Sequence, residues 1–256
     1  MSGTLDFAAE PGAQGELSFG LMFAGDLPSH ADLASSLEKD GGQAGGNIRL
    51  LETPANGAAA SLIMTCNDIP FELQGMLEPV AADLEDADQY FAVEAGDLGQ
   101  AKCLRLAAQF TANDGIAPLE IVRNASRIAL RLADAAQCIA VSWAPAKSIM
   151  GTAYFEKVVS DWLAGGPFPA LGLTSLTMDG DKTFHSRGLA PICGQEIVIP
   201  AMPGLENAGR ARVAIRMIDY MAQNGPIHED GPVEIDGFGK FNVTIDPNGG
   251  NIYLKR

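Results

Sequence analysis

The chain has 256 residues, with 17 Lys and Arg against 32 Asp and Glu, so its formal net charge is −15. Hydrophobic residues make up 47% of it, which is typical of a chain that buries a core and excludes a wholly disordered protein. The acidity disfavours nucleic acids and anionic membranes as partners, because both need a basic footprint. At about 100–200 residues per domain, the length suits one large domain or two modest ones.

Targeting signals and cysteine spacing predict the compartment. The first ten residues carry no Lys or Arg and no sustained apolar run, so we expect no secretory signal. Gly and Pro interrupt the longest uncharged stretches, such as residues 163–178, which predicts no membrane span. The four cysteines form no C-x-x-C pair, which favours buried free thiols in a cytoplasmic protein (Cys66, Cys103, Cys138 and Cys193).

The first half of the chain predicts strands with one clear helix. Residues 1–15 are rich in Gly and Ala and predict a loose tail. Residues 16–24 predict a strand in which Leu17, Phe19, Leu21 and Phe23 alternate onto one face. We then expect a helix at residues 26–40 and a glycine connector at 41–46. Three strands should follow at 47–52, 60–66 and 71–77, and then a short acidic helix at 81–90.

The second half alternates strands with longer helices. Residues 118–135 predict a helix with proline in its first turn and a core-facing stripe at Ile121, Ala125, Ile128 and Leu132. Further helices are expected at residues 152–164 and 205–223, the second with Val213, Met217, Tyr220 and Met221 on one face and Gly225 as its stop. Strands are expected at residues 104–112, 138–143, 170–178, within 183–199, and at 232–235, 240–245 and 251–254.

This order of elements predicts an α+β fold, with helices packed on one face of a mostly antiparallel sheet. Both halves begin with a strand, an Asp, a Pro and a helix, which raises the hypothesis of two similar two-layer halves. The corresponding division is a tail at residues 1–15, an N-terminal half at 16–102 and a C-terminal half at 103–256.

The C-terminal half carries a family resemblance. The run Thr183 to Leu189, then Gly194-Gln-Glu196-Ile-Val-Ile-Pro200, is similar to a T-x-G-L…G-x-E-I-x-I-P pattern, and Tyr220 to Gly231 follows it in the expected order. Over about the last 110 residues the chain therefore resembles an uncharacterised bacterial family, domain of unknown function forty-two sixty-one. That family carries no established activity, so the resemblance implies a fold and no chemistry.

The sharpest short motif is Asp179-Gly-Asp181-Lys-Thr183. Phosphatases of the haloacid-dehalogenase type use D-x-D-x-T, with the first Asp as nucleophile and the second as acid. Here another strand follows directly, where such an enzyme needs a helix. Asp-Gly between two strands is also a strong hairpin signal, so we favour a turn.

A second cluster is expected where a hairpin turns near Ala190-Pro191. That turn would set His185 opposite Glu196, at a cross-strand distance of about 5 Å between Cβ atoms. The pair could orient a general base or simply staple the hairpin, and we favour the staple. Arg187 is a candidate ligand-binding residue beside it, and Cys193 is a candidate nucleophile whose commoner state is a buried thiol.

Two further sets of polar residues are candidates for binding. His228 begins a polar turn after the long helix; it could bind a ligand, although a solvated loop is the simpler interpretation. Arg123, Arg127 and Arg131 recur at every fourth position opposite the apolar stripe. They could form an anion-binding ridge, but we favour a solvated face on which they pair with acids.

The chain contains no phosphate-binding loop, dinucleotide fingerprint, serine-hydrolase elbow or EF-hand loop, so we expect no cofactor and no metal. The sequence does not decide whether the protein is an enzyme. Our first hypothesis is a non-enzymatic protein that binds another macromolecule. The negative charge favours a basic partner, and a homodimer is a further hypothesis. The alternative is a small-molecule hydrolase or ligand-binding protein that uses His185 and Glu196, with Asp179 or Asp181.

Overall fold

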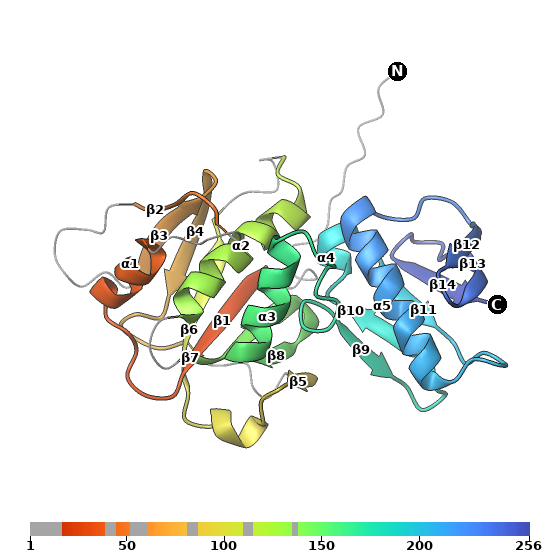
Figure 1. Cartoon of the computed structure of the whole chain (residues 1–256), viewed down its shortest axis with the longest axis horizontal. Coiled ribbons are helices and arrows are strands. Elements are labelled where there is room, and N and C mark those ends of the chain that lie inside the picture. The colour runs from red at the N-terminus through yellow and green to blue at the C-terminus, as the bar shows by residue number, and fades with distance from the viewer. Residues whose placement is uncertain (1–16, 39–44, 52–60, 81–86, 110–114, 135–137) are drawn as a thin grey trace.

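The computed structural model describes residues 17–38, 45–51, 61–80, 87–109, 115–134 and 138–256. The fold is α+β, as expected, but its strands form two mostly antiparallel sheets rather than one (Figure 1). The expected tail and most of the glycine connector lie outside the described residues. No helix among those described is long and apolar enough to cross a membrane.

The first sheet has eight strands in the order β2-β3-β4-β6-β1-β7-β8-β5. All neighbouring pairs are antiparallel except β5 with β8. The strands are β1 (Ser18–Phe23), β2 (Ile48–Leu50), β3 (Ser61–Cys66), β4 (Ile69–Gln74), β5 (Gln89–Phe91), β6 (Lys102–Ala108), β7 (Cys138–Trp143) and β8 (Ser148–Gly151). The strand β1 is central and buried along its whole length.

Helices α1 (His30–Glu38), α2 (Pro118–Ala133) and α3 (Thr152–Leu163) cover one face of this sheet (Figure 1). The predicted stripe on α2 is confirmed, since Ile121, Ala125, Ile128 and Leu132 are all buried. Helix α1 begins where Ser29 and Asp32 exchange hydrogen bonds, each side chain accepting from the backbone N–H of the other.

The second sheet has six strands in the order β12-β13-β14-β11-β10-β9. Its strands are β9 (Ser175–Met178), β10 (Phe184–Arg187), β11 (Glu196–Ile199), β12 (Gly231–Ile235), β13 (Gly239–Ile245) and β14 (Asn251–Lys255). Helix α5 (Asn207–Asn224) packs on β10 and β11 and ends at Gly225, whose φ of 88° suits a glycine. The short helix α4 (Ala190–Cys193) contacts both α2 and α5.

One contiguous apolar cluster runs from Phe19 in the first sheet to Leu254 in the second. The expected boundary between residues 102 and 103 falls inside β6, while the chain passes from one sheet to the other between β8 and β9.

Several predicted elements differ from the structure. Residues 89–91 form β5, so the C-terminal end of the acidic helix expected at 81–90 is wrong; residues 81–86 of that helix lie outside the described ranges. The strand expected over residues 170–178 is shorter, beginning at Ser175. On α5, Val213, Met217 and Met221 are buried as predicted. Tyr220 is 51% exposed, so it does not lie on the buried face with them.

A buried guanidinium joins α5 to the hairpin of β10 and β11. Arg210 is only 2% exposed. Its Nη1 donates hydrogen bonds to the carbonyl oxygens of Lys182 (2.6 Å) and Ile199 (3.2 Å), and its Nη2 donates to Oδ1 of Asn207 (2.7 Å). The guanidinium also lies over the ring of Phe184, 5.0 Å from its centroid. The side chain therefore satisfies backbone carbonyls on both strands at the open end of the hairpin, where β10 begins and β11 ends.

We expect Arg210→Met to lower the free energy of unfolding by about 2–4 kcal/mol, because the buried carbonyl of Ile199 and the partly buried carbonyl of Lys182 lose a charged donor. Urea denaturation measures this loss. Arg212→Met is the matched control, since Arg212 lies two residues away on the exposed face of α5. Equal stability of the two variants would contradict the role given to Arg210.

Candidate functional site

The two faces of β1 carry side chains of different size. Phe19 and Leu21 point toward the helices and are buried in the main core. Because successive side chains of a strand point to opposite faces, Ser18 and Gly20 lie on the other face of the sheet. This second face, away from α2 and α3, carries the site described here.

Small and polar residues form a row across this second face. Gly20 of β1 is paired with Arg105 of β6 on one side and with Ser142 of β7 on the other. The row continues to Ile149 of β8, the partner of Ser142. Four neighbouring strands thus contribute one residue each to the same line.

Gly20 is required by this close packing. A Cβ atom at position 20 would lie 2.4 Å from Oγ of Ser142 and 3.0 Å from Sγ of Cys103. The missing side chain therefore leaves the space that the Ser142 hydroxyl occupies. This hydroxyl has no hydrogen-bond partner in the described part of the chain.

A pocket of about 410 Å³ lies over this row. Its wall includes two cationic side chains, Arg105 and Lys147, and three serines, Ser18, Ser142 and Ser148. Arg105 Nε donates to Ser18 Oγ at 3.4 Å. None of the described residues that line the pocket is acidic, although the chain as a whole carries 32 acids.

The loop between β7 and β8 places Lys147 at the rim of the pocket. Lys147 has a φ of 49°, in the left-handed region that costs a residue with a side chain about 1 kcal/mol or more. Its N–H donates to the carbonyl of Ala144 (3.0 Å), and its carbonyl accepts from the N–H of Asp88 (2.8 Å). The backbone on both sides thus fixes the position of Lys147.

The chemistry of the lining suits the binding of an anion. Guanidinium, ammonium and hydroxyl groups are all donors to carboxylate or phosphate oxygens. Nowhere in the described ranges do three or more His, Cys, Asp or Glu side chains lie together as a group that could hold a metal ion.

The residues singled out in the sequence lie elsewhere, in the second sheet. The motif from Asp179 to Thr183 is the turn between the antiparallel strands β9 and β10, as favoured. His185 Nε2 lies 2.9 Å from Oδ2 of Asp179 across this turn, with both side chains exposed. The N–H of Thr183 donates to Asp181 Oδ1 (2.9 Å), which lowers the pKa of that carboxyl.

The expected pairing of His185 with Glu196 is wrong. His185 pairs with Val198, because the short helix α4 occupies the place of a simple turn and shifts the register. Glu196 instead accepts hydrogen bonds from the Ser186 hydroxyl and from the N–H groups of Leu189 (3.0 Å) and Ala190. His185 and Ser186 point to opposite faces of β10, so His185 and Glu196 do not converge.

The other candidates also lie apart. Arg187 forms an ion pair with Asp88 next to β5, which ties the two sheets together. Cys193 is buried, and burial raises the pKa of its thiol to about 11, so the thiol is protonated at neutral pH and unsuited to attack. His228 is exposed in the loop after α5.

Part of the pocket could have been predicted from the sequence of β1. The alternation of Phe19, Leu21 and Phe23 identifies one face of β1, and the residues between them are Ser18, Gly20 and Met22. Ser18 and Gly20 are small and leave space above this face of the sheet, whereas Met22 packs into a second apolar cluster with Cys103 and Ile149. Which neighbours border that space depends on the order of strands, and this order is not visible in the sequence.

Comparison with known proteins adds no further assignment: no family model, curated protein or solved structure matches the chain. The resemblance of the C-terminal half to the uncharacterised family therefore stays a prediction.

The environment of Glu196 predicts a pH effect. Burial raises the pKa of its carboxyl above the ordinary value of 4.5, although the hydrogen bonds from Ser186, Ala190 and Leu189 act in the opposite direction. The folded chain then binds this proton more tightly than the unfolded chain. The contribution of Glu196 to stability therefore increases as pH falls through the interval just above 4.5, and is lost as pH rises through the folded pKa.

We expect the stability difference between the wild type and Glu196→Gln to grow in favour of the wild type as pH falls through that interval. Urea titrations between about pH 7 and about pH 4 measure it. Glu206→Gln, at an exposed position before α5, is the control. A difference that stays constant or shrinks on acidification would contradict the expectation.

Proposed function

We propose that this protein binds a small organic anion, carrying a carboxylate or phosphate group, in the pocket on the second face of the first sheet. The observation that carries the proposal is the convergence of Arg105, Lys147 and the Ser142 hydroxyl on one pocket.

The size of the pocket limits the ligand. Its volume of about 410 Å³ is near the lower end of the 300–1,000 Å³ typical of ligand pockets. This favours a small carboxylic acid or a phosphate monoester over a dinucleotide. The hydroxyl row and the Ile149 side chain give such a ligand both polar and apolar contacts.

The geometry gives less support to the hypotheses drawn from the sequence. A hydrolase built on His185 and Glu196 needs the two side chains in one pocket, and they engage separate partners on opposite sides of β10. A macromolecular partner, basic in character, rests on the net charge alone. That partner, a homodimer and a cytoplasmic location stay predictions.

A thermal-shift screen tests the proposal with small carboxylates, phosphate monoesters and inorganic phosphate as probes. An anion present at 100 times its Kd adds about 2.7 kcal/mol of stability, which raises the melting temperature by several degrees. We expect at least one probe to give this shift, and the double variant Arg105→Gln/Lys147→Gln to abolish it.

The double variant Arg212→Gln/Lys240→Gln removes the same charge from exposed positions on α5 and β13 and should keep the shift. The proposal fails if no probe stabilises the wild type, or if the shift survives in the Arg105/Lys147 variant.

A further inference from the structure

Two consecutive residues, Asp88 and Gln89, hold the rim of the pocket with their backbone. The N–H groups of Asp88 (2.8 Å) and Gln89 (3.4 Å) both donate to the carbonyl oxygen of Lys147. Lys147 is the last residue of the turn between β7 and β8, and its φ of 49° lies in the left-handed region. A residue with a side chain keeps this conformation only where its surroundings enforce it, so the contacts at its carbonyl determine where Lys147 lies.

The side chains of the same two residues contact the second sheet. The carboxylate of Asp88 forms an ion pair with the guanidinium of Arg187 in β10. The side-chain nitrogen of Gln89 donates to the carbonyl oxygen of Leu176 in β9. Figure 1 shows β5, which begins at Gln89, beside β8 and close to β9. Asp88 and Gln89 therefore connect the pocket rim to the second sheet through one short segment.

Two further contacts join the same wall of the pocket to the second half of the chain. The hydroxyl of Ser148, which lines the pocket, donates to the carbonyl oxygen of Gly172 in the segment that leads into β9. An added Cβ atom at Gly188, the residue after β10, would lie 2.9 Å from both Cα and Cβ of Ala146. The chain after β10 thus packs directly on the turn that carries Lys147.

We propose that the ion pair between Asp88 and Arg187 positions Lys147 for anion binding, so that the second sheet regulates the affinity of the pocket. This inference rests on the proposed function, since it needs Lys147 to bind the anion. Neither Asp88 nor Arg187 is among the described residues that line the pocket, so both act through the backbone of Lys147. The side chains of Asp88 and Arg187 are 37% and 47% exposed, so the contact can be broken from solvent.

Charge and position predict opposite effects at Asp88. Its carboxylate is a negative charge next to the pocket rim, so its removal would strengthen anion binding if only the local net charge mattered. If the ion pair positions Lys147, the same substitution weakens binding, because Lys147 is no longer held in the binding position. A substitution at Asp88 therefore separates the two explanations by the direction of the change in affinity.

Isothermal titration of the full chain tests this proposal, with phenyl phosphate and benzoate as probes, one for each class of anion. We expect Asp88→Ala to weaken binding by about threefold to fivefold, which is the effect that a partly exposed ion pair can supply. Arg187→Gln should have a similar effect. The double variant Asp88→Ala/Arg187→Gln should bind like either single variant, because both remove one contact. Asp88→Glu keeps the carboxylate and should bind more tightly than Asp88→Ala.

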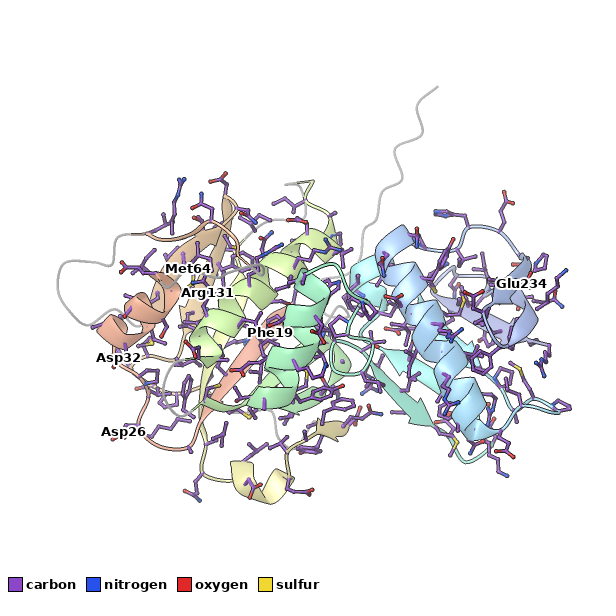
Figure 2. The ribbon with its side chains drawn as sticks, in the orientation of Figure 1. Phe19, Asp26, Asp32, Met64, Arg131 and Glu234 are labelled. Atoms are coloured by element: carbon purple, nitrogen blue, oxygen red, sulfur yellow. The ribbon has the colours of Figure 1, made fainter. Side chains whose placement is uncertain are left out.

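Asp26→Ala is the matched control, because it removes the same charge from an ion pair with Lys102 (2.8 Å) in the first sheet. Figure 2 shows Asp26 on the loop after β1, on the side of the molecule away from the second sheet. This variant should bind the probes like the wild type. Circular dichroism checks that all variants are folded. In the ligand-free protein, the amide ¹H–¹⁵N signal of Lys147 should shift in Arg187→Gln and stay in place in Asp26→Ala.

The outcomes separate this inference from the proposed function. No binding of either probe by the wild type would count against both. If the wild type binds a probe but Asp88→Ala binds it equally or more tightly, the anion site stands and the positioning role of the ion pair is wrong. An unchanged Lys147 signal in Arg187→Gln, or an equal loss of affinity in Asp26→Ala, would also overturn that role.

Discussion

The alternation of large and small side chains along β1 determines what each face of the first sheet does. Phe19 and Leu21 fill the space beneath α2 and α3, whereas Gly20 on the opposite face leaves the Ser142 hydroxyl room above the sheet. Because β1 is paired on both sides, by β6 and β7, any change at Gly20 is transmitted to both neighbours. One strand therefore supplies both sites: Phe19, Leu21 and Phe23 pack in the main core, and Ser18 and Gly20 line the pocket.

In the second sheet, polar groups are used to build the fold. Arg210 satisfies carbonyls at the open end of the β10–β11 hairpin, and Glu196 accepts from the backbone N–H groups at the start of α4. A buried charged group whose hydrogen bonds all go to its own scaffold stabilises that scaffold but offers little to a ligand. In the first sheet, the Ser142 hydroxyl lines a pocket and has no hydrogen-bond partner among the described residues.

The sequence predicted the elements better than it predicted the site. The stripe of Ile121, Ala125, Ile128 and Leu132 follows from helical periodicity, a local property, and it is confirmed. The His185–Glu196 pairing depended on a register that four residues of α4 changed, and such short helices give little periodic signal. The pocket joins Gly20, Arg105 and Ser142, which are far apart in the chain and become neighbours only through the strand order.

The central claim is that the second face of the first sheet is a binding site for a small anion, and its most direct test is an amide ¹H–¹⁵N spectrum titrated with the anion that stabilises the protein most. We expect the largest changes at Gly20, Ser142 and Lys147, which line the pocket, with little change in β12 to β14. Changes centred on His185 and Asp179 in the second sheet, or spread evenly over the chain, would contradict it.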